Sequence, residues 1–156
     1  MGTPLAYFEF FVQLLLALAC GGVLGWERES QNKPAGLRTH MLVAVGAAAF
    51  TAVTLQMHVI FGVEESTTLD PARAVQGIIG GIGFLGAGTI IQSRGSVQGI
   101  TTAATIWVVG AIGVACGAQQ YDFAIITAVT TFLILAVLGR LERHMVRRKT
   151  TSDQGA

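Results

Sequence analysis

Asp70–Trp107 reads D-P-A-R-A-V-Q-G-I-I-G-G-I-G-F-L-G-A-G-T-I-I-Q-S-R-G-S-V-Q-G-I-T-T-A-A-T-I-W, and this segment indicates what kind of protein the chain is. It carries no charge between Ala74 and Ile91, about 18 residues, enough for a helix to cross the hydrocarbon core of a bilayer. Six glycines fall inside that run: Gly77, Gly80, Gly81, Gly83, Gly86 and Gly88. Because small residues let helices approach closely in lipid, the segment predicts a transmembrane helix with tight contacts, within the protomer or between protomers.

The rest of the composition agrees with a membrane protein. Of 156 residues, 52% are hydrophobic and only 12% are charged, against about 25% charged in soluble domains. We therefore expect an all-α protein with five transmembrane helices in a membrane domain of residues 1–140, followed by a basic tail of residues 141–156. The predicted spans are Leu5–Gly25, Thr39–Phe61, Ala72–Ile91, Ile100–Ala118 and Tyr121–Gly139.

The basic residues predict the orientation, because Lys and Arg are concentrated in cytoplasmic loops. They gather in the first loop, the third loop and the tail: Arg28, Lys33, Arg38, Arg94, Arg140, Arg143, Arg147, Arg148 and Lys149. The second loop is acidic and contains Glu64, Glu65 and Asp70. We therefore expect the N-terminus outside and the C-terminus in the cytoplasm. The net charge of +1 gives no support to nucleic-acid binding.

Catalysis finds no support in the motifs. Gly81-x-Gly83-x-x-Gly86 matches the spacing of a dinucleotide-binding loop, but that loop must follow a strand and open a helix, whereas here it lies inside an apolar span. The chain has no H-E-x-x-H and no G-x-S-x-G motif. We expect a non-enzymatic protein without a cofactor.

Asp70 and Arg73 open the third predicted span from the outside and are the first functional candidates. Asp70 followed by Pro71 is a good helix start, with the carboxylate at the N-cap and proline in the first turn. The alternative is that Asp70 forms a cation or proton site balanced by Arg73. The pattern leaves both interpretations open.

A second group of candidates lies at the inner surface, where the first span ends and the second begins. Glu27 and Glu29 are close in sequence to Arg28, Lys33 and Arg38 and predict a network of ion pairs that fixes this turn. Ionisable groups held near the membrane interior often mark functional sites.

Thr102 in the fourth span is a further candidate, although threonines in membrane helices most often bond to their own helix or a neighbour. Glu27 and Asp70 are predicted on opposite faces of the membrane, so they cannot share one metal ion in a single state. Whether the protein binds a metal stays unknown from the sequence.

Five segments together resemble the MgtC/SapB family of bacterial inner-membrane proteins. They are G-W-E-R-E at Gly25–Glu29, A-G-L-R-T at Ala35–Thr39, D-P-A-R at Asp70–Arg73, G-I-G-F-L-G-A-G at Gly81–Gly88 and G-I-T-T-A-A-T-I-W at Gly99–Trp107. The resemblance implies five spans and a cytoplasmic C-terminus. It also implies a link to growth in low magnesium and to virulence, and one activity proposed for the family is restraint of ATP synthase.

Two departures limit what the resemblance implies. Gln98 stands where members often have Arg, and longer members carry a soluble C-terminal domain, so this chain looks like the short form. We expect a homo-oligomer in the lipid bilayer that modulates a membrane complex such as ATP synthase. The alternatives are a cation transporter or channel for Mg²⁺ or protons, or a structural subunit of a larger assembly. Val12 and Gln13 recur as Val75 and Gln76, an indication of the internal repeats found in transporters.

Overall fold

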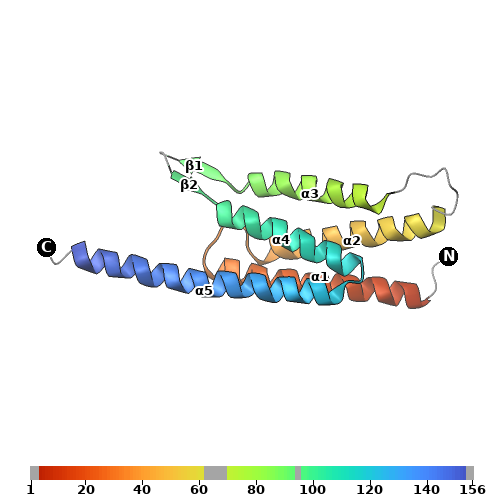
Figure 1. The fold of residues 1–156 in the computed structure, drawn as a ribbon, viewed down its shortest axis with the longest axis horizontal. Helices are drawn as coiled ribbons and strands as arrows, with labels where there is room; N and C mark the ends of the chain where they lie inside the picture. The colour runs from red at the N-terminus through yellow and green to blue at the C-terminus, as the bar shows by residue number, and fades with distance from the viewer. Residues whose placement is uncertain (1–3, 62–69, 94–95, 154–156) are drawn as a thin grey trace.

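The computed structural model describes residues 4–61, 70–93 and 96–153, which form five helices and one two-stranded hairpin (Figure 1). In chain order the elements are α1 (Pro4–Ser30), α2 (Leu37–Phe61), α3 (Pro71–Ala87), β1 (Ile91–Ser93), β2 (Ser96–Gln98), α4 (Ile100–Gly117) and α5 (Tyr121–Asp153). The helices lie side by side along the long axis, and successive helices run in opposite directions. The α1–α2 turn and the hairpin are therefore at one end, and the α4–α5 turn is at the other.

Four of the helices have the length and apolar composition needed to cross a membrane: Pro4–Ser30, Leu37–Ile60, Ile100–Gly117 and Tyr121–Arg140. These agree with four of the five predicted spans. The remaining helix, α3, has 17 residues and rises about 26 Å, slightly less than the roughly 30 Å hydrocarbon core. The fifth span and the orientation of the termini stay predictions.

Helix α3 is shorter at its C-terminal end than the third predicted span, and a β-hairpin follows it. The helix ends at Ala87, whereas the span was expected to reach Ile91. Ile91 instead starts β1 and pairs with Gln98 in an antiparallel hairpin. The chain re-enters helix at Gly99, whose φ of 90° is left-handed, and a Cβ there would overlap the Thr89 carbonyl. Only glycine fits this junction without strain.

The tightest packing joins α1, α2 and α4. The centre of this three-helix core contains Ala17, Leu24, Ala44, Val109 and Ile112, all fully buried. Glycines allow the close approach. Gly21 and Gly25 face α2, where an added Cβ would lie 2.8 Å from the His40 carbonyl oxygen and 2.7 Å from the Leu37 Cα, respectively. Gly113 and Gly117, one turn apart on α4, meet the backbone of α2 even more closely.

Helix α3 is at the edge of the bundle, and most of its glycines do not pack within the protomer. At four of them no other atom lies within 4 Å of where a Cβ would be: Gly77, Gly80, Gly81 and Gly83. Of the other two, Gly86 packs against Ala103 of α4, and Gly88 caps the end of α3. Within the protomer these four glycines therefore make no close contact, and contacts between protomers, the other alternative, stay a prediction.

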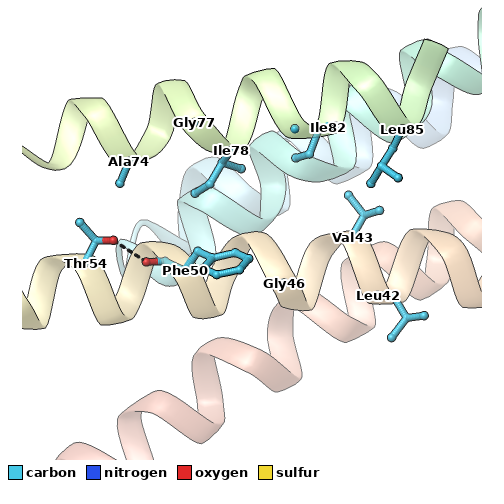
Figure 2. Close-up of a pocket in the computed structure, with 11 residues that line it drawn as sticks. Leu42, Val43, Gly46, Phe50, Thr54, Ala74, Gly77, Ile78, Ile82 and Leu85 are labelled. Atoms are coloured by element: carbon cyan, nitrogen blue, oxygen red, sulfur yellow. Dashed lines mark hydrogen bonds between the residues drawn. The ribbon is translucent and has the colours of Figure 1, made fainter. Parts of the chain in front are cut away.

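These four glycines make no close contact because α3 packs against its neighbours through larger residues. Ala74, Ile78, Ile82 and Leu85 point toward α2 (Figure 2). They leave an apolar groove of about 610 Å³ between the two helices, because Gly77 on α3 and Gly46 on α2 contribute no side chain to fill it. The helix is thus held by its branched residues, and its glycine positions are left open.

Candidate functional site at the α1–α2 turn

The candidate site begins with a buried ion pair at the end of α1. Glu27 and Arg28 are 7% and 3% exposed. The Nε of Arg28 donates to one carboxylate oxygen of Glu27, and the Nε2 of Gln31 donates to the other. Each carboxylate oxygen therefore has a hydrogen bond, and the charge of Glu27 is balanced by Arg28. Removing one partner would leave the other as an uncompensated buried charge.

The turn after α1 is closed by its own backbone. The N–H of Lys33 donates to the Arg28 carbonyl at 3.1 Å, and that of Asn32 to the Glu29 carbonyl at 3.0 Å. Asn32 has a φ of 53°, in the left-handed region that asparagine tolerates better than most residues. The turn therefore returns the chain directly into α2.

Glu29 caps the next helix and does not form the predicted ion pair. Its Oε2 accepts a hydrogen bond from the backbone N–H of Leu37, the first residue of α2, at 2.7 Å. Gly36 packs against the same carboxylate, because an added Cβ would lie 2.6 Å from that oxygen. Lys33 and Arg38 are exposed, and the described residues place neither in an ion pair with Glu29. A carboxylate next to the unpaired N–H groups of a helix start is electrostatically favourable.

His40 links α2 to α4 and is the residue that the sequence interpretation missed. Its side chain is fully buried. Nδ1 lies 2.9 Å from the Gly36 carbonyl oxygen, and Nε2 lies 3.1 Å from the Thr105 Oγ1. The Thr105 hydroxyl lies 2.8 Å from the carbonyl of Thr102, which is itself buried at 2% exposure. A histidine immediately after A-G-L-R-T in an apolar span was the available signal.

The contacts of His40 and Thr105 include three hydrogen-bond acceptors, namely the Gly36 carbonyl, His40 Nε2 and the Thr102 carbonyl. A neutral histidine and one hydroxyl have only two protons to donate to them. Nδ1 must carry a proton to bond the Gly36 carbonyl, so a neutral His40 offers only a lone pair at Nε2. The single Thr105 hydroxyl proton then goes either to Nε2 or to the Thr102 carbonyl. A charged His40 would satisfy every contact, because Nε2 would donate and Thr105 could keep its bond to Thr102.

We call these residues the turn cluster: Glu27, Arg28, Gln31, His40 and Thr105. A cavity of about 570 Å³ with polar and apolar walls opens beside the cluster. The cavity is lined by Arg28, Gln31, Asn32, Lys33, Pro34, Gln98, Gly99, Thr101, Thr102, Ile134, Leu135, Leu138 and Gly139. Its polar wall comes from the α1–α2 turn and the start of α4, and its apolar wall comes from α5. The arrangement suits binding of a polar or amphipathic group.

Asp70 and Arg73 are far from the turn cluster, at the opposite end of the bundle (Figure 1). Asp70 is the N-cap of α3, and its Oδ1 accepts from the Ala72 N–H at 2.9 Å. Arg73 is exposed, and its backbone N–H bonds the Asp70 carbonyl at 3.0 Å. Asp70 therefore caps α3, as one of the two interpretations predicted. Its role as a cation or proton site stays a prediction. In the described residues no three His, Cys, Asp or Glu side chains converge as direct coordination of a metal by side chains alone would require.

The comparisons agree with the motifs. The model of the MgtC family matches residues 14–144. The chain is 37% identical over 140 residues to "Putative magnesium transporter YhiD" of Escherichia coli K12, with 90% of this chain and 65% of YhiD covered. It is 40% identical to protein SrpB of Synechococcus elongatus, covering 84% of this chain and 75% of SrpB.

It is also 45% identical over 121 residues to protein MgtC of Brucella abortus, covering 78% of this chain. The chain spans 65% of YhiD and 46% of that MgtC, so each of these relatives has residues with no counterpart in the match. No solved structure gives a significant match. The family model spans the buried turn cluster, three of the five helices in full and most of the other two, and the chain therefore belongs to the MgtC family.

Proposed function

We propose that this protein is a non-enzymatic regulator in the bacterial inner membrane, which acts by binding another membrane complex through α3. The observation that carries the proposal is an open surface of that helix, at four glycines that make no close contact in the protomer: Gly77 and Gly81 line the groove beside α2, and Gly80 and Gly83 lie outside it. Each glycine costs a helix about 1 kcal/mol relative to alanine in water. Contacts inside the protomer do not offset that cost at these four positions.

A partner helix would make use of such a surface. In lipid, where no hydrophobic force drives helices together, association depends on close van der Waals contact between small residues. The membrane sector of ATP synthase is the partner that the family resemblance suggests. A second copy of the chain is the other candidate, and would make the protein a homo-oligomer.

The same proposal includes the placement of the chain. Five spans with the N-terminus outside would put the turn cluster and the hairpin on the cytoplasmic side. Helix α5 runs without a break from Tyr121 to Asp153, so residues 141–153 of the basic tail would extend into the cytoplasm. There they would meet anionic headgroups, at about 1 kcal/mol per basic residue near the surface.

The test follows ATP hydrolysis and proton pumping together in inverted membrane vesicles, with and without the protein. If the proposal holds, wild type lowers both activities. Gly83→Leu should lose this effect while the protein still folds, because no neighbouring helix lies within 4 Å of where its Cβ would be. Ala19→Leu is the matched control, since Ala19 is an exposed small residue on α1. Full inhibition by Gly83→Leu would remove the proposed binding surface.

A cation transporter is the second candidate, and two observations favour it. One relative carries the words magnesium transporter in its name, and the Glu27–Arg28 pair is an ionisable group held inside the bundle. In the vesicle assay a transporter would lower the proton gradient while hydrolysis holds or rises. It also predicts ion flux in purified proteoliposomes that Asp70→Asn abolishes, and well-controlled liposomes without flux would eliminate it.

A further inference from the structure

A second polar cavity lies at the opposite end of the bundle from the turn cluster. It has a volume of about 330 Å³ and is bounded by the first turns of α1, the last turns of α2 and the α4–α5 turn. Its polar lining consists of Glu9, Gln13, Gln56 and Gln119, and we call it the glutamine cavity. None of the residues that line it is basic.

Gln13 is the residue that calls for an explanation. Its side chain is 6% exposed, and its Oε1 has no hydrogen-bond partner. Among the described side chains it is the only buried polar atom without a hydrogen-bond partner. A buried acceptor without a partner is destabilising, so its presence indicates a water or an ion that completes it. A leucine would fill similar space without that cost.

The other groups around the cavity match the same kind of ligand. Glu9 adds a carboxylate, and Gln56 and Gln119 add amide groups at the exposed rim. Gln119 has a φ of 59°, a left-handed conformation that is uncommon for a residue other than glycine. The cavity therefore combines one negative charge and several oxygen acceptors with no positive charge.

We propose that the glutamine cavity binds a hydrated divalent cation. Carboxylate and amide oxygens are the groups that hard cations prefer, and Mg²⁺ gives up its waters reluctantly, so one carboxylate with several waters is a usual arrangement for it. Six waters occupy about 180 Å³ at about 30 Å³ each, which fits inside 330 Å³. Gln13 Oε1 accepts a hydrogen bond from a bound water, and Glu9 supplies the opposing charge.

Binding of Mg²⁺ to the purified full chain in lipid nanodiscs tests the proposal by calorimetry. We expect saturable binding that Glu9→Gln and Gln13→Leu each weaken about tenfold, the loss expected for one hydrogen bond to a charged group. Gln76→Leu is the matched control, because Gln76 is an exposed glutamine on α3, and it should bind like wild type. No binding by wild type, or equal binding by all four proteins, would overturn the site.

Three further measurements separate loss of binding from loss of folding and test the form of the bound ion. Gln13→Leu should be as stable as wild type without Mg²⁺ or more stable, because it removes the unpaired acceptor; a clear loss of stability would show that Gln13 is a packing residue, and would count against the site. Gln13→Glu should bind Mg²⁺ more tightly than wild type. Cobalt hexaammine, which resembles the hydrated ion but cannot lose its ligands, should compete; if it does not, the ion is not bound in hydrated form.

This site goes beyond the regulatory function proposed above. The calorimetric assay contains no partner complex, so the cation site and the regulator can each fail while the other stands.

Discussion

The same substitution, glycine to alanine, should have opposite effects at two positions in this protein. Gly113→Ala should destabilise the bundle, whereas Gly83→Ala should leave it unchanged or slightly more stable. Gly113 is on α4 at the closest contact with α2, and Gly83 is on the open side of α3. The pair therefore separates glycines needed for packing inside the protomer from those that are not.

The magnitude follows from what the new methyl group would meet. At Gly113 it would overlap the Ala44 carbonyl oxygen and lie 2.7 Å from the Cβ of Ala47, both on α2. A backbone atom cannot rotate away, so α2 and α4 must separate, and overpacking of this kind costs about 1–3 kcal/mol. At Gly83 nothing lies within 4 Å. The gain of about 1 kcal/mol in helix propensity applies to both positions, so the difference between them is the overpacking cost alone.

The assay is reversible unfolding of the purified protein in mixed detergent micelles, followed by tryptophan fluorescence. The free energy of unfolding of Gly113→Ala should lie about 1–3 kcal/mol below that of Gly83→Ala. Equal values, or a lower value for Gly83→Ala, would refute the conclusion that the core is formed by α1, α2 and α4. A protein that is oligomeric under the assay conditions would reveal itself by a dependence of unfolding on concentration.

Three further predictions concern the polar residues. His40→Ala should lower the free energy of unfolding by about 1–3 kcal/mol, because it removes the buried hydrogen bonds to Gly36 and Thr105. An unfolding titration that matches wild type would contradict this. Glu29→Ala should cost about 1 kcal/mol by removing the cap of α2, and Glu29→Gln, which keeps an acceptor oxygen, should restore most of it in the same titration. Asp70→Asn should keep the α3 cap and the stability, so any loss in the vesicle assay would assign Asp70 a role beyond capping.

The positions of the helices followed from the sequence because two strong signals coincide in it. Long uncharged runs are required for crossing a bilayer, and charged residues gather in the connections. Asp70 with Pro71 located the start of α3 to within a residue. The end of α3 was harder to predict, since Thr89–Ile91 is as apolar as the helix before it. The hairpin that follows depends on the pairing of Gln92 with Val97 and on the backbone of Gly99, which hydropathy does not report.

Which side of each helix faces the core could not be read from glycine content. Glycines in α3 and in α4 look alike as sequence, yet those of α3 are mostly open, whereas Gly113 and Gly117 of α4 contact α2 and Gly110 contacts Ile82 of α3. The difference depends on which helices are neighbours, information that no local pattern contains. His40 was missed for a related reason, because its partner Thr105 is 65 residues away along the chain. Glu29 was assigned to an ion pair because capping by a residue of another helix needs the turn geometry.

The packing between the two polar ends bears on how the protein could work. The turn cluster and the glutamine cavity are separated by core residues that include Ala17, Leu24, Val109 and Ile112, each fully buried and apolar. An ion that crossed this layer would lose its hydration without gaining a polar partner, at a cost of many kcal/mol. A transporter would have to separate packed helices such as α2 and α4, whose backbones meet closely at Gly113 and Gly117. A regulator needs no such opening, because a cation at one end and a partner along α3 both act on surfaces that are already accessible.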